Sequence, residues 1–494
     1  MSTDSPQPTR YKVDALLVPN QSTSSPVEHT FAPLVRVNAS ALADATQIIN
    51  QPASIILKPT ITGYEVLASG TQSQIDQMDL PASIMEITLR DRMLIPALVN
   101  AHTHLDLTHI GPIAHNPADG FVKWVDHIRA NRKADDTDIR EAVALGIQAS
   151  LAGGSIAVGD IAGAPMGRIT DAPAHELAAS PLIGVSYLEF FGIGTTASAA
   201  ITKINHYLST IYPQSQADIA DSGVKIGLQP HAPNTVDLAV YRWAAAAARA
   251  RSMPLSTHLA ETPEEREFIA DGTGPQRTFL ERFGIWHDSI LDHIAKSNHP
   301  VEHLAEVLTS PVARLAEPGS SSLASTPQKD PARRAGPPKL LPFLVAHVND
   351  ATDAAIEILA STNTSVAYCP RASTYFGADH HFGPHRYRDM LAAGVNVCLG
   401  TDSIVNLDTP GRISILDEMR LLHRRDGADA MTLLQLATTN GAKALGLDDS
   451  NFTLTPNTHP LGLLAVPIEP GASDSWAGAM QSNEPPEWVF LVTK

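Results

Sequence analysis

The sequence predicts an α/β protein, a (β/α)8 TIM-type barrel with a small composite β-sandwich domain formed from both chain ends. Three observations lead to this prediction. Eight buried, strand-like runs alternate with helical segments between residues 94 and 447, which is typical of parallel βα units. Several of these runs end in a histidine or an acid. Shorter strand-like runs, separated by turn-forming residues, flank the region on both sides.

The barrel strands are short apolar runs, and their number is the one that closes a barrel. Helical stretches lie between them, such as residues 238–251 with an alanine run and residues 413–424 with apolar residues at helical spacing. The strands are predicted at 94–101, 155–160, 182–190, 224–230, 254–258, 343–347, 365–369 and 395–401.

Strands outside the barrel are expected to join in one sheet domain, which ties both ends of the chain together. This organisation predicts N-terminal sandwich strands in residues 1–93, a metal-dependent catalytic barrel at 94–447 and C-terminal sandwich strands in 448–494. Residues 309–339 are rich in Pro, Ser and Ala without an apolar period, which predicts a flexible surface insertion rather than an active-site lid or a partner-binding arm. The flanking strands are predicted at 11–18, 53–69, 84–95, 460–467 and 488–492.

Charge and cysteine content exclude several classes of protein. The 35 Lys and Arg residues against 52 Asp and Glu give a net charge of −17, which argues against electrostatic binding of nucleic acid or anionic membranes. Binding of small polar substrates remains compatible with this charge. Cys369 and Cys398 are the two cysteines, so no disulfide framework is expected and a reducing, cytoplasmic location is predicted. We expect no secretory signal and no membrane span.

Metal-ligand or acid/base side chains stand at the ends of five apolar runs. Because polar groups at the ends of parallel strands converge on one rim of a barrel, the pattern predicts a hydrolytic metal centre. These residues are His102 and His104 in NAHTH, His231 in PHAP, His258 and Glu261 in HLAE, His347 in FLVAHVND and Asp402 in LGTDS.

Each residue also has a structural interpretation. With 20 histidines, about one His-x-His pair is expected by chance. His347 alone would be read as a core histidine, and Asp402 as the cap of the next turn. His380 and His381, in the loop ADHHFGPH, lack a strand-end setting and are read as solvent-exposed rather than as substrate contacts. The five runs taken together are not easily explained as structural.

The set NAHTH, PHAP, HLAE, CPR and LGTDS, with a histidine on the sixth strand, resembles the amidohydrolase superfamily in its aminohydrolase (deaminase and chlorohydrolase) branch. The resemblance covers roughly residues 90–447. Within this branch, FVKWVDHIRANR, YCPRASTYFG and the long segment after His258 most resemble aminofutalosine deaminases of the alternative menaquinone pathway. Deaminases of S-adenosylhomocysteine or methylthioadenosine are close behind. The sequence departs from the family pattern at two places. The sixth strand reads AHVND, in which the expected histidine, His347, is still present, and residues 309–339 form an unusual insertion.

The resemblance implies one divalent ion, for which Zn²⁺ is favoured over Fe²⁺ although the ligands accept both. Binding to such an ion lowers the pKa of water to about 7, so that the metal-bound hydroxide attacks the amine-bearing ring carbon and ammonia leaves. Asp402 would take the proton of the hydroxide, Glu261 would protonate the ring nitrogen, and His347 would orient the hydroxide and stabilise the tetrahedral oxygen. The implied metal ligands are His102, His104, His258 and Asp402.

Substrate contacts are expected from His231, Trp124 and Arg371. Two-metal members of the superfamily carry a carboxylated lysine where this chain has Gln229 and His231, which favours one metal and leaves His231 for substrate. Trp124, with Arg129 and Arg132 on the same segment, would line the pocket, or its helix would pack the indole inward.

The predicted function is therefore hydrolytic deamination of an adenine-like nucleoside of the aminofutalosine, S-adenosylhomocysteine or methylthioadenosine type. The alternative is a chlorohydrolase or an amide or cyclic-ureide hydrolase of the same superfamily, because the same hydroxide serves both reactions. A catalytically silent binding protein is disfavoured, since no expected ligand is missing. A homodimer is expected from the relatives.

Overall fold

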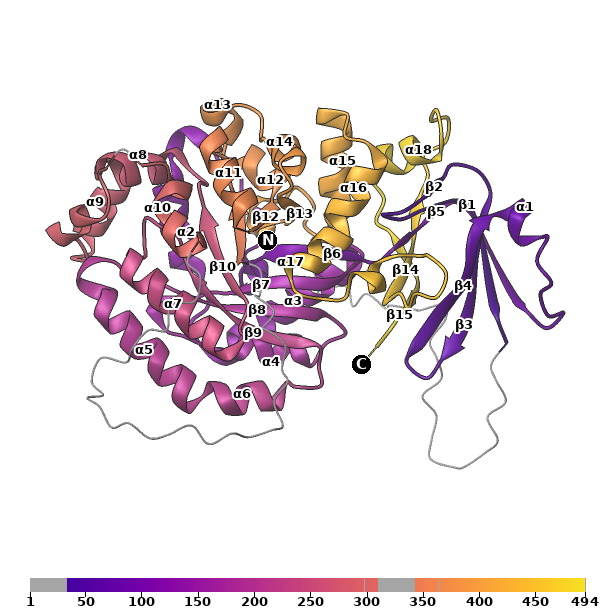
Figure 1. Ribbon diagram of the computed structural model, residues 1–494, viewed down its shortest axis with the longest axis horizontal. Coiled ribbons are helices and arrows are strands. Elements are labelled where there is room, and N and C mark those ends of the chain that lie inside the picture. The colour runs from indigo at the N-terminus through magenta and orange to yellow at the C-terminus, as the bar shows by residue number, and fades with distance from the viewer. Residues whose placement is uncertain (1–32, 297, 310–342, 363, 494) are drawn as a thin grey trace, which may run out of the picture.

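The computed structural model describes residues 33–296, 298–309, 343–362 and 364–493. Within these ranges the chain forms a barrel and, beside it, a separate sheet (Figure 1). The predicted strand at 11–18 and residues 310–339 of the predicted insertion lie outside the described residues.

The predicted barrel is confirmed. Its eight strands are hydrogen-bonded in chain order, and their paired neighbours run parallel. Nearly all their residues are buried, because helices cover the outside and side chains fill the inside. The strands are β6 (Leu98–Thr103), β7 (Ser155–Ala162), β8 (Ile183–Phe190), β9 (Val224–Pro230), β10 (Leu255–Leu259), β11 (Phe343–His347), β12 (Ser365–Tyr368) and β13 (Asn396–Leu399).

The contact that closes the barrel joins the end of β6 to the loop after β13. Thr103 pairs with Asp402 in a parallel bridge. The amides of Thr401 and Asp402 donate to the carbonyl of His102 at 3.0 and 3.1 Å, and the His104 amide donates to the Asp402 carbonyl at 3.0 Å. First and last strands therefore meet through residues of the predicted metal site.

Helices between the strands pack around the barrel, and α7 has the bounds predicted for it, with buried alanines on its inner face. The helices of this part are α2 (Phe121–Asn131), α3 (Asp136–Ala152), α4 (Ala172–Ala178), α5 (Ala197–Thr210), α6 (Tyr212–Asp218), α7 (Leu238–Arg251), α8 (Pro263–Asp271), α9 (Gly274–Arg282), α10 (Pro300–Thr309), α11 (Asp353–Ser361), α12 (Pro370–Tyr375), α13 (Ala378–Phe382), α14 (Tyr387–Ala392), α15 (Ile415–Asp426), α16 (Ala430–Ala437) and α17 (Thr439–Ala444).

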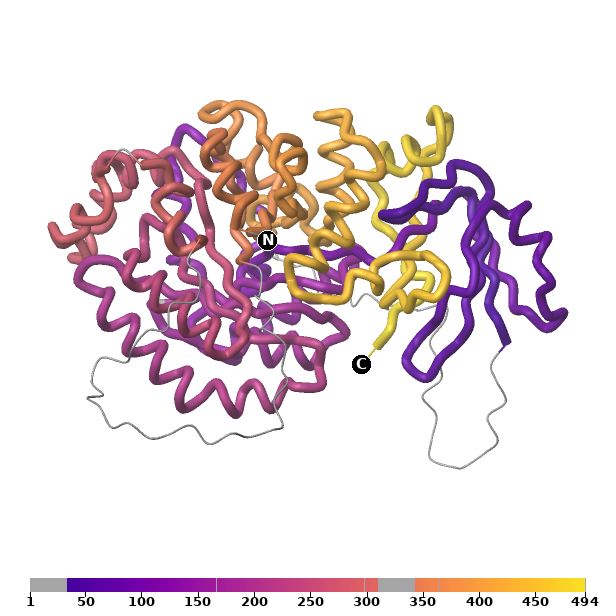
Figure 2. The backbone as a smooth tube through the Cα atoms, viewed as in Figure 1, coloured from indigo at the N-terminus to yellow at the C-terminus, as the bar shows by residue number. Residues whose placement is uncertain are grey.

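The second sheet combines both flanks of the barrel, as predicted. Its order is β15-β14-β5-β1-β3-β4, and β2 pairs with β1. In Figure 2 the indigo early strands and the yellow late strands lie side by side. The strands are β1 (Val35–Ala43), β2 (Ile48–Ile49), β3 (Ala53–Thr60), β4 (Gly63–Thr71), β5 (Met85–Pro96), β14 (Gly462–Pro467) and β15 (Glu487–Leu491), accompanied by α1 (Gln72–Ile75) and α18 (Ser475–Gln481).

Three features of this sheet differ from the sequence-based expectation. Residues 53–69 were read as one strand, but they contain β3 and most of β4, which pair antiparallel with each other. The apolar run 94–101 was read as one barrel strand, but it ends β5 and begins β6, because both strands are buried there and hydropathy does not mark the change of sheet. The central strand β1 was missed because Asn38 interrupts its apolar pattern. In the fold this side chain accepts hydrogen bonds from Arg36 Nε (2.8 Å) and Ser54 Oγ (2.6 Å), which makes its burial tolerable.

Both cysteines are free and buried, as expected for Cys369. Among the described helices, none combines the length and the apolar character needed to cross a lipid bilayer.

Replacing Phe490 with Ala should destabilise the protein, because this ring joins the last strand to the N-terminal strands. Phe490 is 1% exposed, and its centroid lies 4.7 Å from that of Tyr64 on β4. A cavity of this kind costs about 3 kcal/mol or more, measured as the loss in free energy of unfolding by chemical denaturation. Glu487→Ala on the same strand removes only an exposed ion pair with Arg92, which is worth less than about 1 kcal/mol. Equal losses in the two variants would contradict the assigned role of the ring.

Candidate active site

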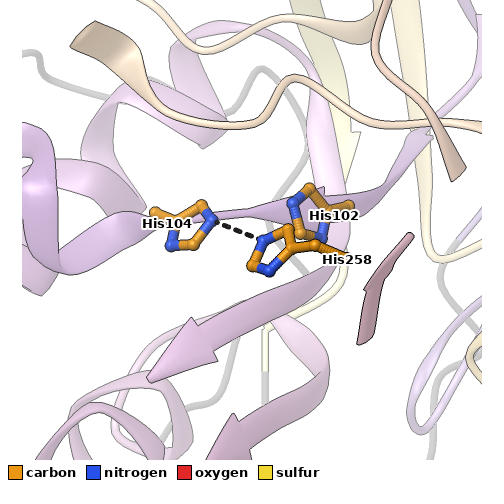
Figure 3. A group of neighbouring side chains, drawn as sticks. All are labelled: His102, His104 and His258. Carbon is orange, nitrogen blue, oxygen red and sulfur yellow. Dashed lines mark hydrogen bonds between the residues drawn. The ribbon is translucent and has the colours of Figure 1, made fainter. Parts of the chain in front are cut away.

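Three histidines converge at the carboxyl ends of β6 and β10 (Figure 3). The Nε2 atoms of His104 and His258 lie 3.3 Å apart, and one ligand nitrogen from each of the three side chains lies within 4.8 Å of the others. His102 and His104 share a face because alternate residues of an extended chain point the same way. The ring of His102 stands nearly perpendicular to the other two.

Asp402 completes this cluster from the loop after β13. Its Oδ1 lies 3.4 Å from His104 Nε2 and 4.0 Å from His102 Nε2. His347, the last residue of β11, forms a second compact group with His102 and Asp402. Asp402 and His347 have positive φ angles of 57° and 73°, a strained region for such residues that the surrounding structure must stabilise.

The chemistry of these side chains fits a divalent cation. Burial, followed by the charge of His258, holds the pKa of His102 and of His104 well below the usual value, and burial lowers that of His258 to about 3. The imidazoles are therefore neutral and have lone pairs to offer. Both ring nitrogens of His102 and Nδ1 of His104 are buried without a hydrogen-bond partner in the described structure. A cation held by three imidazoles and one carboxylate would meet that need.

Two carboxyl groups beside the cluster have raised pKa values. Burial, and next the charge of Glu418, raises the pKa of Asp402 to about 7. Burial, and next the charge of Asp402, raises the pKa of Glu261 well above its usual value. The raised pKa of Glu261 favours its protonated form near neutral pH, which general-acid catalysis requires.

Glu261 is held in place by the loop after β10. Its Oε1 lies 3.6 Å from His347 Nε2. The amides of Ala260 and Glu261 both donate to the Glu265 carboxylate at 2.9 Å, and Asn349 Nδ2 donates to the Glu261 carbonyl at 3.0 Å. Glu265, at the start of α8, therefore orders the loop as well as stabilising the helix end.

A cavity of about 550 Å³ opens onto these residues. His104, His258, Glu261, His347 and Asp402 line it, and the remaining wall is mostly apolar. This combination of an apolar cleft and a few converging polar groups is typical of a small-molecule site.

Two of the three expected substrate residues line the cavity. Trp124 on α2 does so while packing against Phe121 and Phe376. His231 follows β9, with its ring centroid 4.9 Å from that of His258. Its Nδ1 lies 2.7 Å from the Thr235 hydroxyl, which itself donates to the Ala232 carbonyl. With the Thr235 hydroxyl donating to Ala232, its oxygen accepts from the Nδ1-protonated tautomer of His231, and in that tautomer Nε2 is an acceptor.

Arg371 does not reach the cavity, and its expected substrate contact needs correction. The guanidinium donates to Glu418 Oε1 at 2.6 Å, to Asp408 Oδ1 at 3.2 Å and to the Ser414 carbonyl at 3.1 Å. The helix α12 begins directly after β12 and directs this side chain towards α15, so we assign it a structural role. His380 and His381 are exposed on α13, as the sequence indicated.

The predicted pocket residue Arg132 lines the cavity, but its buried acidic partners Asp106 and Glu189 were missed at the level of sequence. Arg132 donates to Asp106 Oδ2 at 2.8 Å and lies 3.5 Å from Glu189 Oε2. Asp160 accepts from the amide of Leu105, and burial, with the neighbouring Asp106 second, raises its pKa to about 7. The sequence did contain a pattern that could have identified Glu189. It is the single acid in the apolar run VSYLEF, and the predicted site residues stand in similar positions.

Known proteins share this architecture. The chain matches the Amidohydrolase family over residues 93–457. It is 25% identical over 418 residues to a 5-methylthioadenosine/S-adenosylhomocysteine deaminase of Haloarcula marismortui, covering 81% of each chain. It is 28% identical over 372 residues to an aminodeoxyfutalosine deaminase of Deinococcus radiodurans, covering 72% of this chain and 73% of that protein.

Among solved structures, the zinc complex of atrazine chlorohydrolase TrzN from Arthrobacter aurescens TC1 has the same fold. The TM-score is 0.59 at 16% identity, and the match covers 90% of this chain and 91% of that one. The family match spans the whole barrel and every residue of the histidine and carboxylate cluster. The chain therefore belongs to the amidohydrolase family and is a hydrolytic enzyme that acts on carbon–nitrogen bonds.

Proposed function

We propose that the protein is a metal-dependent deaminase of an adenine-like nucleoside. The observation that carries this proposal is the buried cluster of three imidazoles and one carboxylate at the inner end of a cavity, with a second carboxyl group, Glu261, beside it. The names of the two relatives support deamination in particular.

His102, His104, His258 and Asp402 would hold one divalent ion, for which we propose Zn²⁺. When bound, such an ion supplies a water whose pKa is about 7 and which is therefore nucleophilic at neutral pH. The zinc in the atrazine chlorohydrolase structure supports this choice of metal.

The remaining steps are assigned to the side chains of the chain itself. Glu261 donates its proton to the ring nitrogen next to the amine-bearing carbon, which makes that carbon electrophilic. Asp402 accepts the proton of the attacking water and passes it to the departing amine, which leaves as ammonia. His347, 3.6 Å from Glu261, is positioned to stabilise the oxygen that develops at the attacked carbon. His231 offers Nε2 to a donor group of the substrate.

We further propose a substrate of the aminofutalosine type, and with it a role in menaquinone biosynthesis. Support comes from the Deinococcus radiodurans relative and from the aromatic wall of the cavity around Trp124. A chlorohydrolase is the second candidate, favoured by the fold shared with atrazine chlorohydrolase. The expected homodimer and cytoplasmic location stay predictions.

A substrate panel tests the reaction. The purified protein should release ammonia from 6-amino-6-deoxyfutalosine, S-adenosylhomocysteine or 5′-methylthioadenosine, with the absorbance change that accompanies conversion of adenine to hypoxanthine. An ammonia-coupled assay and ultraviolet spectroscopy measure both. Chloride release from a chlorinated triazine, without ammonia from any nucleoside, would contradict deamination and favour the second candidate.

Glu261→Gln should lower kcat by about 10²-fold or more, because the amide cannot donate the proton that activates the ring. Metal content should stay unchanged, since Glu261 is not in the proposed ligand set. Steady-state kinetics on the best substrate measure the effect, and Glu267→Gln, an exposed change on the neighbouring α8, serves as the control. Full turnover in the Glu261 variant would refute its role.

His102→Ala should lose most of its bound metal, because a four-ligand site that lacks one imidazole binds far more weakly. The wild-type chain should retain about one zinc ion after dialysis, as measured by inductively coupled plasma mass spectrometry. His380→Ala, which removes an exposed histidine, should retain the wild-type content. Unchanged metal in the His102 variant would remove this residue from the ligand set.

A further inference from the structure

His385 lies in the short loop between α13 and α14, and its side chain contacts the backbone of the active site. Its Nε2 lies 2.9 Å from the carbonyl oxygen of His347. Because a carbonyl only accepts, Nε2 carries a hydrogen and donates it. Burial lowers the pKa of His385 to about 4, so the ring is neutral at neutral pH. The one ring hydrogen of His385 is therefore engaged with His347.

Strand pairing fixes His347 on one side only. On the side of β10 it pairs with Leu259, whose carbonyl accepts from the Val348 amide at 3.0 Å. On the side of β12 the pairing ends one residue before His347. The chain leaves the strand at this point, with φ angles of 73° at His347 and 53° at Val348, a region that a β-branched residue rarely adopts. The hydrogen bond from His385 therefore holds His347 on the side where strand pairing has ended.

The imidazole of His385 is itself fixed by stacking. It lies on the ring of Tyr368, the last residue of β12, with centroids 3.7 Å apart and an angle of 11° between the two planes. Arg425 on α15 donates to the Tyr368 hydroxyl at 2.9 Å and so holds this second ring. Stacking fixes the plane of the imidazole, and the Nε2–H, which lies in that plane, is directed at the His347 carbonyl.

Packing alone does not require an imidazole at this position. Nδ1 of His385 is buried and has no hydrogen-bond partner in the part of the chain that the structure describes, and burial of an unpartnered polar atom is unfavourable. A phenylalanine would stack on Tyr368 without burying such an atom. What the imidazole adds to the fold is therefore the Nε2 donor.

The residues after His347 extend this arrangement to the second functional side chain, Glu261. The Asp350 amide donates to the Ala260 carbonyl at 3.0 Å, and Asn349 Nδ2 donates to the Glu261 carbonyl at 3.0 Å. The side chains of His347 and Glu261 lie 3.6 Å apart. A shift of the His347 backbone would therefore change the distance between two groups that are proposed to act on the substrate together.

We propose that His385 is a positioning residue, which holds the imidazole of His347 in its working orientation by donating from Nε2 to the His347 carbonyl. Among the described residues, His385 is outside the set that lines the cavity, so it acts through His347. The inference rests on the role proposed for His347 in the deaminase mechanism. Loss of the donor should lower turnover rather than substrate binding, because a group that stabilises the developing oxygen acts in the transition state.

Variants of the metal-loaded, full-length protein separate the donor from the ring. His385→Phe keeps the stack but lacks the donor, and it should lower kcat by about tenfold with a change in KM of less than about twofold. His385→Asn, whose amide is too short to reach the carbonyl, should show the same loss. His385→Gln carries an amide N–H near the position of Nε2 and should recover part of kcat. Steady-state kinetics on the best substrate of the panel measure these effects.

The matched control is His423→Phe. Nδ1 of His423 lies 3.3 Å from the Ala428 carbonyl at the end of α15, so this change also removes a histidine that contacts a backbone carbonyl, away from the cavity. It should leave kcat unchanged. All variants should keep the zinc content of the wild type, since His385 is not in the proposed ligand set. Loss of zinc from His385→Phe and His385→Asn would overturn the inference.

A double-mutant cycle shows whether His385 acts through His347. His347→Ala should lower kcat by about 10²-fold or more. In that background His385→Phe should cause a further loss of less than about twofold, because the imidazole that it positions is absent. A full tenfold loss in the His347→Ala background, or wild-type kcat in both His385→Phe and His385→Asn, would contradict the positioning role.

The outcome for His385 is separable from the outcome for the proposed function. Ammonia release by the wild type with unchanged kcat in His385→Phe refutes the positioning role and leaves the deaminase proposal standing. If the panel shows chloride release instead, deamination is refuted, and the same variants are measured on the chlorinated triazine. A loss of kcat in His385→Phe that is absent in the His347→Ala background then still supports the positioning role, because His347 would stabilise the developing oxygen in either reaction.

Discussion

The contact between β6 and the loop after β13 is the one on which the site depends, because it closes the barrel and assembles the ligand cluster at once. The carbonyl of His102 accepts from the amides of Thr401 and Asp402, and the amide of His104 donates to the Asp402 carbonyl. A buried hydrogen bond from Asn100 Nδ2 to Thr401 Oγ1 reinforces the same junction. His102 and Asp402, which are 300 positions apart, are therefore joined by a backbone hydrogen bond and both supply side chains to the ligand cluster. A barrel that failed to close would not assemble this cluster.

This coupling explains why a strained backbone is tolerated at the site. Asp402 and His347 adopt positive φ angles, as does Ala260 beside Glu261. Each is fixed by neighbours: the closure contacts hold Asp402, the Glu265 carboxylate accepts from Ala260, and the carbonyl of His347 lies 2.9 Å from His385 Nε2. The strain is offset by surrounding hydrogen bonds, which keeps the functional groups in one arrangement.

Burial sets the electrostatics of the inner cavity. It keeps the imidazoles neutral and raises the pKa of Asp402 and Glu261, so that metal ligands and proton carriers are available together. Charges that would disturb this balance are neutralised nearby: Arg132 by Asp106, and Arg371 by Glu418.

Much of the fold and of the candidate site could be predicted because both depend on local patterns. The eight apolar runs predicted the barrel strands to within a few residues, and each site residue that the cluster contains follows one of those runs. The strand β1 was missed at Asn38, because one of the partners that make its burial tolerable, Ser54, lies on another strand. The sequence also did not reveal that the chain passes from β5 to β6 between Pro96 and Leu98, because the residues on both sides of this point are buried and apolar.

The sequence by itself determined the barrel, the identity of the ligand-type side chains and their place at strand ends. Hydrophobic periodicity and the ends of apolar runs are local features, so they can be identified from consecutive residues. Only the tertiary structure decided which of these side chains share a cavity. It placed Glu189 in the cavity wall beside Arg132, and it placed the Arg371 guanidinium beside Glu418. The physical reason is that a side chain's partners are set by through-space distances between elements far apart in the chain, and no local pattern encodes those distances.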